Sequence, residues 1–292
     1  MSRGRATEDG AMGSPLQPQS VRVNDADFAY IEQGRGEPVI FVHGSLGDYR
    51  SWGAQLAPFC EQHRVISYSR RYHWPNAQPN DDVTYQVAQH VADLGALIEA
   101  RGLAPAHVVG SSYGALTALS FTVERPDLVR SLVLGEPPLL PWLARRSDGS
   151  TLVETFISNA FRPAGQAFLR GEAEAGVRLF LNGVFGAGSF DRLPPLARDA
   201  MLDNAPAMRA ETTTPPEQYF PDLPSEDVRR LQTPTLLVQG EMSPAMFGLI
   251  TDELARALPT AERATIPATS HGMHTQNPTG YNAVVLAFLT TH

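Results

Sequence analysis

The sequence of 292 residues contains no lysine, and all 23 basic residues are arginine. Enzymes that form a Schiff base with lysine, anchor pyridoxal phosphate or hold nucleotides through a P-loop lysine are therefore excluded. The chain also has a single cysteine, Cys60. One cysteine rules out an internal disulfide bond and a zinc site built from several cysteines.

Long apolar runs and basic clusters are missing as well. No run approaches the roughly 18 apolar residues of a membrane-spanning helix, and the first twenty residues lack the apolar middle of a signal peptide. We therefore expect a cytoplasmic protein with no membrane partner. The formal net charge of −8 and the lack of any basic cluster beyond pairs such as Arg70 and Arg71 argue against a nucleic-acid partner. We expect a small-molecule partner, and the sequence does not indicate an oligomeric state.

The pattern of the chain predicts its fold class. Residues 1–20 mix Gly, Ser, Pro and charge without apolar periodicity, which predicts a disordered lead-in. After them, short β-branched runs that end in Gly or Ser alternate with helical patterns. The expected strands lie within residues 28–34, 38–44, 64–69, 107–112, 131–136 and 234–240, and the expected helices within 52–63, 84–101 and 114–124. This alternation predicts an α/β fold with a mostly parallel, doubly wound sheet, whose function gathers at the carboxyl ends of the strands.

One segment breaks the alternation. Residues 137–222 contain no convincing buried strand, only helical pieces separated by Gly and Pro. A structureless loop of that length is implausible in a compact domain. We therefore predict a helical cap at 137–222, inserted between the core segments 21–136 and 223–292.

A G-x-S-x-G pentapeptide is the first catalytic motif. It spans Gly110 to Gly114, with Ser112 at its centre, after an expected strand and before an expected helix. Glycines are needed there because the backbone of such a serine is strained and neighbouring side chains would collide with the turn. The motif predicts Ser112 as a nucleophile at the amino end of a helix.

With these features the chain, from Val21 to His292, resembles an α/β-hydrolase. The stretch "FVHGSLGDYRSW" is similar to the family's His-Gly turn, and "PATSHGMHTQNP" to the loop that carries its catalytic histidine. The resemblance implies that the backbone NH groups of Ser45 and Tyr113 form the oxyanion hole and that His271 is the base. His43 is expected to be structural, and His274 to pack nearby.

The acid departs from the commonest family pattern. Where most members have an aspartate, this sequence has Ser243, which cannot balance an imidazolium charge. Two candidates remain: Glu241, and Glu136 at the end of the preceding strand, where haloalkane dehalogenases and zearalenone-type lactonases take their acid. A residue before proline is expected to be extended, and Pro137 and Pro138 lack NH groups that could occupy the carboxylate locally. We therefore favour Glu136.

The nucleophile indicates the reaction class. Epoxide hydrolases and dehalogenases of this fold attack with aspartate, whereas Ser112 implies an acyl-enzyme, with no metal and no organic cofactor. The expected function is a hydrolase of a fairly apolar carboxylic ester or lactone. The alternatives are a thioesterase, a carbon–carbon bond hydrolase, a cofactor-free perhydrolase, a biosynthetic cyclase, or a non-catalytic ligand-binding receptor.

Substrate contacts are expected from the cap and from one strand end. Arg70 and His73, in "YSRRYHWPN", could meet a polar group of the substrate. Apolar cap side chains could line a pocket, although we expect only a minority to do so; they are Trp142, Phe156, Phe161, Phe180, Phe185, Met201, Met208 and Phe220.

Overall fold

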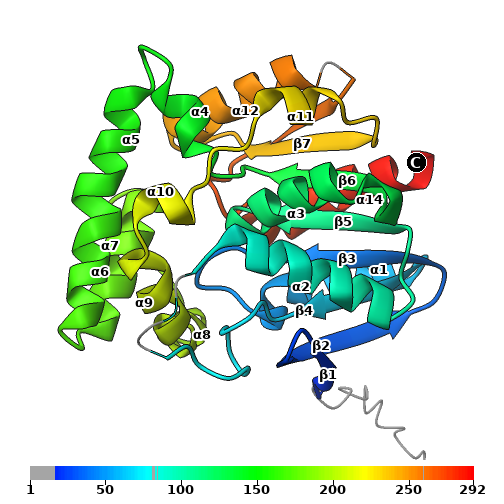
Figure 1. Ribbon diagram of the computed structural model, residues 1–292, viewed down its shortest axis with the longest axis horizontal. Helices are drawn as coiled ribbons and strands as arrows, with labels where there is room; N and C mark the ends of the chain where they lie inside the picture. Colours follow the sequence, from blue (N-terminus) through cyan, green and yellow to red (C-terminus); the bar gives the residue numbers. More distant parts are fainter. Residues whose placement is uncertain (1–16, 81–82, 84, 259) are drawn as a thin grey trace, which may run out of the picture.

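The computed structural model describes residues 17–80, 83, 85–258 and 260–292, and an eight-stranded sheet lies at its centre (Figure 1). The strands are ordered β1-β2-β4-β3-β5-β6-β7-β8. Their bounds are β1 Gln19–Val23, β2 Ala26–Gly34, β3 Glu37–Val42, β4 His63–Tyr68, β5 Ala106–Ser111, β6 Val129–Gly135, β7 Thr235–Gly240 and β8 Glu262–Ile266. β2 pairs antiparallel with β1 and β4, and the neighbours from β4 to β8 are parallel. The predicted fold is confirmed.

The amino-terminal prediction needs one correction. Gln19 and Ser20 belong to β1 and pair with β2, so the expected lead-in is wrong for these two residues. The strand is short and has no fully buried residue, which leaves little apolar pattern to recognise. Residues 1–16 lie outside the described part of the chain.

Helices cover both faces of the sheet because successive strand residues point to opposite sides. On β3, Ile40 and Val42 join one apolar cluster, whereas Val39 and Phe41 join the other. The first cluster includes residues of α2 Val87–Ala100, α3 Tyr113–Glu124 and α12 Ala245–Ala257, and the second includes residues of α1 Gly53–Cys60 and α14 Pro278–Thr291. Short helical turns at η1 Tyr49–Trp52, η2 Pro126–Leu128 and α13 Met273–Gln276 complete the core.

An inserted helical region separates β6 from β7, as predicted. Its helices are α4 Leu140–Ala144, α5 Ser150–Phe156, the π-helical turn η3 Ile157–Phe161, α6 Arg162–Leu169, α7 Ala173–Phe185, α8 Pro195–Asp203, α9 Ala205–Thr213 and α10 Pro216–Tyr219. α11 Ser225–Arg229 follows beside the core helix α12. α7 shows why the region folds: its buried residues at 177, 180, 181 and 184 form one apolar stripe. In Figure 1 the helices from α5 to α10 gather at one end of the sheet. The exact limits of the cap and core segments stay predictions.

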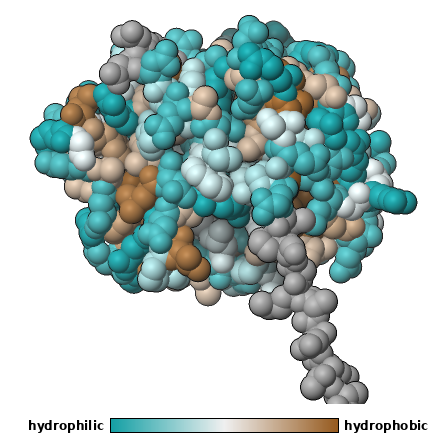
Figure 2. Space-filling model, turned by 90° about the horizontal axis from the view of Figure 1, so that it is seen from below, coloured by the Kyte–Doolittle hydropathy of each residue, from teal (hydrophilic) through white to brown (hydrophobic). Residues whose placement is uncertain are grey.

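The face of the molecule seen in Figure 2 is mainly hydrophilic. In Figure 2, apolar areas are small and separated from one another. Large apolar side chains with high exposure in the described part of the chain are Leu169, Leu196 and Met242. Among the described helices, none is both long enough and apolar enough to span a bilayer.

Candidate active site

Ser112 sits on a strained turn between β5 and α3. Its φ of 54° and ψ of −124° lie outside the usual regions for a side-chain-bearing residue. A Cβ on Gly110 would approach the carbonyl oxygen of Gly114 to 2.6 Å, and one on Gly114 would approach that of Val42 to 2.1 Å. Both positions therefore require glycine, for the reason that the sequence motif suggested. The turn holds Ser112 at the amino end of α3, partly exposed.

His271 and Glu136 form a buried pair beside this turn. The His271 Nδ1 donates to Glu136 Oε2 at 2.6 Å, which leaves Nε2 as the proton-accepting nitrogen. Nε2 has no hydrogen-bond partner among the described residues. The second carboxylate oxygen, Oε1, accepts from the backbone NH of Gly240 at 2.9 Å. Phe247 stacks on the imidazole with the ring centroids 3.9 Å apart. The ring is thus held on one edge and one face, with Nε2 unengaged.

The backbone of Glu136 differs from our expectation. Its φ of 49° lies in the left-handed region, so the prediction of an extended residue before proline is wrong. The preference of a pre-proline residue is a local one, and the two hydrogen bonds of the buried carboxylate oppose it. The following residues do leave the carboxylate free for other partners. Pro137 and Pro138 have no NH group, and the NH groups of Leu139 and Leu140 donate to the carbonyl oxygens of the two prolines.

The alternative acid lies elsewhere. Glu241 is exposed, and its Oε2 accepts from the backbone NH of Ala268 at 2.8 Å. It therefore orders the loop that leads to His271 rather than contacting the imidazole. Ser243, at the usual position of the acid, has a buried Oγ without a hydrogen-bond partner among the described residues.

The loop after β3 runs against the serine turn. A Cβ on Gly44 would lie 3.0 Å from Ser112 Cβ, so the backbone passes close to the nucleophile. Ser45 lines the same cavity as Ser112. Tyr113 is the first residue of α3, where backbone NH groups lack partners inside the helix and carry the positive end of its dipole.

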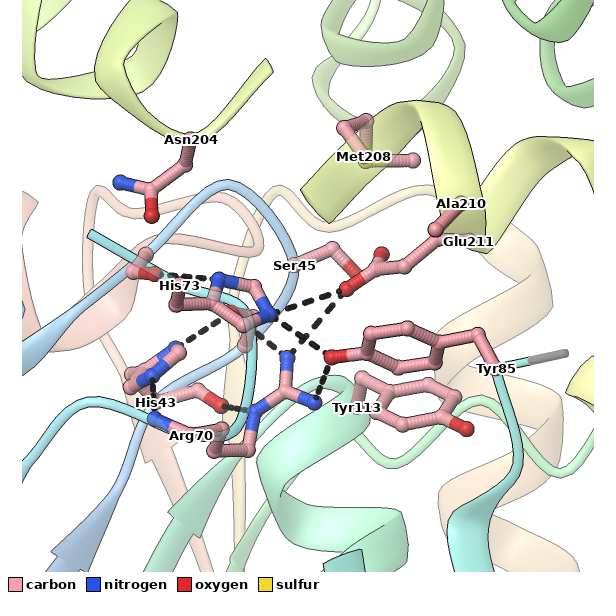
Figure 3. A network of polar contacts seen from close by, with 12 residues as sticks. His43, Ser45, Arg70, His73, Tyr85, Tyr113, Asn204, Met208, Ala210 and Glu211 are labelled. Atoms are coloured by element: carbon pink, nitrogen blue, oxygen red, sulfur yellow. Dashed lines mark hydrogen bonds and ion pairs between the residues drawn. The ribbon is translucent and has the colours of Figure 1, made fainter. Parts of the chain in front are cut away.

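Buried polar groups support this loop from below (Figure 3). Arg70 donates from Nε to the carbonyl oxygen of His43 at 3.0 Å and from a guanidinium NH2 group to that of Gly44 at 3.2 Å. Its backbone NH donates to His43 Nε2 at 2.8 Å, so the His43 proton sits on Nδ1 and points to the Gly44 oxygen. Burial, with the nearby charges of His73 and Arg70, lowers the pKa of His43 well below its usual value. His43 is therefore a neutral structural residue.

Two cavities of unequal size meet at Ser45 and Ser112. The larger, of about 300 Å³, also borders His271, and the apolar part of its wall comes mainly from Phe180, Leu181, Val184, Phe185, Ala197, Ala200 and Met201. The smaller, of about 20 Å³, borders Tyr113 and is closed by Pro138, Leu140, Phe156, Phe180, Val184, Tyr219, Phe220, Met246 and Phe247. Of the apolar residues considered from the sequence, Trp142, Phe161 and Met208 line neither cavity.

The three predicted substrate contacts are buried and engaged in other bonds. Arg70 supports the loop after β3, His73 contacts Tyr85 OH at 2.7 Å, and Trp142 Nε1 donates to the carbonyl oxygen of Leu223 at 2.7 Å. None of the three borders either cavity. Their contact with a substrate stays a prediction.

The sequence analysis did not identify two cap residues that lie near the site. Glu211 on α9 lies 3.2 Å from His73 Nε2 and 3.5 Å from Arg70. Burial by itself would raise the pKa of Glu211, but its bonds with His73 and Tyr219 and the charge of Arg70 lower the pKa to about 2. Tyr219 on α10 reaches Ser45 Oγ at 2.8 Å. No local pattern marks either residue, because their partners are about 140 and 174 positions away in sequence.

A metal centre finds no support in the described residues. No group of three or more His, Cys, Asp or Glu side chains there is arranged to hold a metal ion. Burial, aided by the charge of His271, lowers the pKa of His274 to about 4. The His274 ring packs against Trp52, with the ring centroids 4.4 Å apart, so His274 is a packing residue. The site instead contains the hydroxyl of Ser112, the imidazole of His271 and the carboxylate of Glu136.

Comparison with known proteins agrees with the fold. The sn-1-specific diacylglycerol lipase ABHD11 of Mus musculus is 26% identical over 265 residues, which cover 86% of this chain and 80% of that protein. The crystal structure of the enol-lactonase from Burkholderia xenovorans LB400 aligns with a TM-score of 0.73 and 20% identity, over 93% of this chain and 100% of that one. Bromoperoxidase from Bacillus anthracis aligns with a TM-score of 0.73 and 22% identity, over 94% and 100%. The profile described as "Alpha/beta hydrolase family" matches residues 39–284, and this chain belongs to that family.

Proposed function

We propose that this protein is a serine hydrolase that cleaves an apolar carboxylic ester or lactone through an acyl-enzyme on Ser112. The observation that carries the proposal is the 2.6 Å hydrogen bond between His271 Nδ1 and Glu136 Oε2, with Nε2 unpaired beside a cavity that also borders Ser112. A carboxylate behind the imidazole fixes the tautomer that can accept a serine proton.

The proposed mechanism uses only groups of this chain. His271 Nε2 takes the Ser112 proton as Oγ attacks the substrate carbonyl carbon. The backbone NH groups of Ser45 and Tyr113 stabilise the oxyanion, and Glu136 stabilises the imidazolium. His271 then returns the proton to the leaving alkoxide. In the second half-reaction His271 Nε2 takes a proton from water as the water oxygen attacks the acyl carbon, and it gives that proton to Ser112 Oγ as the acid is released.

The two cavities suggest how an ester lies in the site. The leaving oxygen must be close to His271, and only the larger cavity borders that residue. The alcohol part then occupies the space of about 300 Å³, and the acyl chain points into the cavity of about 20 Å³. A cavity needs roughly 10–15 Å³ to hold one water-sized group, so the smaller one suits a methyl group. We therefore propose short-acyl esters of bulky apolar alcohols, or lactones that carry little on the acyl side.

The relatives support the reaction class without deciding the substrate. One is named a lipase and another an enol-lactonase, and both names denote cleavage of an ester bond. Another is named a bromoperoxidase. Because unrelated reactions occur on this fold, substrate choice has to come from experiment.

The test combines burst kinetics with active-site labelling. p-Nitrophenyl acetate should release a burst of p-nitrophenol equal to the enzyme concentration, and an organophosphonate should add its mass to Ser112. Ser112→Ala should abolish both signals, whereas Ser111→Ala, the matched control, should keep them. Full turnover by Ser112→Ala would refute the proposal, and equal loss in Ser111→Ala would identify the wrong serine. A parallel panel of esters, lactones and thioesters separates the proposed reaction from thioester cleavage, and the lack of any burst or label would favour a receptor.

A further inference from the structure

A tyrosine of the cap contacts both residues assigned to the oxyanion hole. The Tyr219 hydroxyl lies 2.8 Å from Ser45 Oγ, and its ring stacks on that of Tyr113, with centroids 4.4 Å apart and planes 11° apart. The same hydroxyl donates to Glu211 Oε2 at 2.6 Å. Because a phenol has one proton and Glu211 receives it, Ser45 is the donor to the Tyr219 oxygen.

Glu211 is a fixed anchor for this tyrosine. It is fully buried, and Arg70 and His73 lie within 3.5 Å of its Oε1. Arg70 at the same time donates to the carbonyl oxygens of His43 and Gly44. The loop after β3 is thus held from two sides: by its carbonyl groups through Arg70 and by the Ser45 side chain through Tyr219 (Figure 3 shows the Arg70 side).

The loop needs such support because its backbone is strained. Leu46, next to Ser45, has a φ of 59°, a conformation that costs a non-glycine residue free energy and persists only where the surroundings enforce it. The described bond within the turn, from Gly47 NH to the Gly44 oxygen, is long at 3.3 Å. Outside contacts therefore have to keep the Ser45 NH in one direction.

We propose that Tyr219, anchored by Glu211, is a positioning residue for the oxyanion hole. The cap then does more than enclose the substrate: through the Tyr219 hydroxyl it orients the backbone NH of Ser45 toward the developing oxyanion. This inference rests on the proposed serine hydrolase mechanism. Tyr219 also borders the smaller cavity, and its proposed effect on the reaction passes through Ser45.

Tyr219→Phe is the sharpest perturbation, because it removes the hydroxyl and keeps the ring that stacks on Tyr113. Loss of a whole oxyanion donor lowers kcat by about 10²–10³-fold, so a misdirected donor should lower it by about 10- to 100-fold. KM for p-nitrophenyl acetate should change by less than about threefold, because the oxyanion forms only in the transition state. Affinity for a trifluoromethyl ketone, whose adduct carries an oxyanion, should fall by the same factor as kcat/KM. A merely structural role would not produce this split.

Ser45→Ala tests the other end of the same hydrogen bond, since it removes the hydroxyl that contacts Tyr219 and keeps the backbone NH. It should reproduce the kinetic loss, and Ser45→Thr, which retains a hydroxyl, should restore most of the rate. In the double variant Ser45→Ala/Tyr219→Phe the losses should not multiply, because both changes break one hydrogen bond. Tyr281→Phe, which removes a buried hydroxyl without a partner in the described residues, is the matched control and should keep wild-type kcat. Glu211 is unsuitable as a test because its loss would leave Arg70 buried without its counter-charge.

The outcomes separate the two proposals. If wild type turns over through Ser112 but Tyr219→Phe and Ser45→Ala keep its kcat and its ketone affinity, the positioning role alone is refuted. Multiplicative losses in the double variant would refute it too. If Tyr219→Phe does not fold, Ser45→Ala and its threonine rescue decide. If Ser112→Ala retains turnover, the hydrolase proposal fails and this inference fails with it.

Discussion

Glu136→Gln should nearly silence the enzyme, and the structure allows the size of the effect to be worked out. His271 Nδ1 lies 2.6 Å from Glu136 Oε2. Taking about 4 Å between the centres of the two charges, an imidazolium and a carboxylate attract by about 4 kcal/mol at an effective dielectric constant of about 20. In the proposed mechanism this attraction arises when the imidazole accepts the Ser112 proton, so it stabilises the transition state. Its loss corresponds to a fall in kcat of about 10³-fold.

The hydrogen-bond geometry adds to that loss. In the wild-type protein the Glu136 carboxylate accepts two hydrogen bonds, one from His271 Nδ1 and one from the Gly240 NH. A glutamine has a single acceptor oxygen, and if this oxygen serves Gly240, the amide NH2 group faces Nδ1 and favours the tautomer with its proton on Nε2. That tautomer cannot accept the Ser112 proton. The expected total is a fall in kcat of about 10³–10⁴-fold, similar to the loss on neutralising a triad carboxylate elsewhere.

The assay is steady-state hydrolysis of p-nitrophenyl acetate, with circular dichroism and thermal unfolding to verify the fold. Glu241→Gln, which removes an exposed carboxylate of the neighbouring loop, is the control and should cost less than about tenfold. The reasoning is refuted if Glu241→Gln cripples the enzyme while Glu136→Gln stays near wild type, since the acid would then follow β7. A folded Glu136→Gln variant with less than about tenfold loss would contradict the electrostatic argument.

Three further predictions use other parts of the site. Adding Ser243→Asp to the Glu136→Gln variant should recover part of the lost kcat in the same assay, because it restores a carboxylate at the end of β7; no gain would mean that this position does not reach the imidazole. Met246 and Phe156 both line the small cavity and a neighbouring cavity of about 380 Å³. Met246→Ala should therefore enlarge the space for an acyl chain and raise kcat/KM for hexanoate relative to acetate esters by about tenfold or more, whereas Met242→Ala, at an exposed position, should not. An unchanged ratio would place the acyl chain elsewhere. The pKa of His274 is lowered to about 4 in the folded protein, whereas in the unfolded chain a histidine has a pKa of about 6.5. Between these two values the unfolded chain binds more protons than the folded protein, so the free energy of unfolding should fall as pH drops from about 6.5 to about 4. Urea unfolding of His274→Gln should show a shallower fall, and an identical pH slope would contradict the shifted pKa.

Sequence patterns predicted the fold correctly, and they indicated the strained turn that holds Ser112, because both depend on local requirements. β-Branched runs form buried parallel strands wherever they recur between helices. Gly110 and Gly114 are dictated by clashes within a few residues of Ser112, so the pentapeptide alone carries the information. Glu136 was favoured because Ser243 replaces the usual aspartate, because the resemblance offers relatives with the acid after the preceding strand, and because of the two prolines; the extended backbone that formed part of the last reason is wrong.

Long-range interactions limited the remaining inferences. The left-handed backbone of Glu136 follows from bonds to Gly240 and His271, which are more than 100 positions away. Arg70 lies after a strand end and looked available for substrate, but Glu211, 141 positions later, turns it into a buried support. None of these three partners is visible in a local window of sequence, because the fold brings each of them close from a distant segment of the chain.

The end of β7 contacts the carboxylate proposed as the acid, although Ser243 stands where most of the family has an aspartate. Gly240 donates its backbone NH to Glu136, and a Cβ on this glycine would lie 2.4 Å from the carbonyl oxygen of Ser270. The loop after β7 and the loop that carries His271 are therefore packed too closely for a side chain at this position. The glutamate side chain, one methylene longer than an aspartate, reaches from the end of β6 to the imidazole with Oε2, and its Oε1 accepts from the Gly240 NH. The arrangement thus keeps both strand ends in contact with the one carboxylate that we propose as the acid.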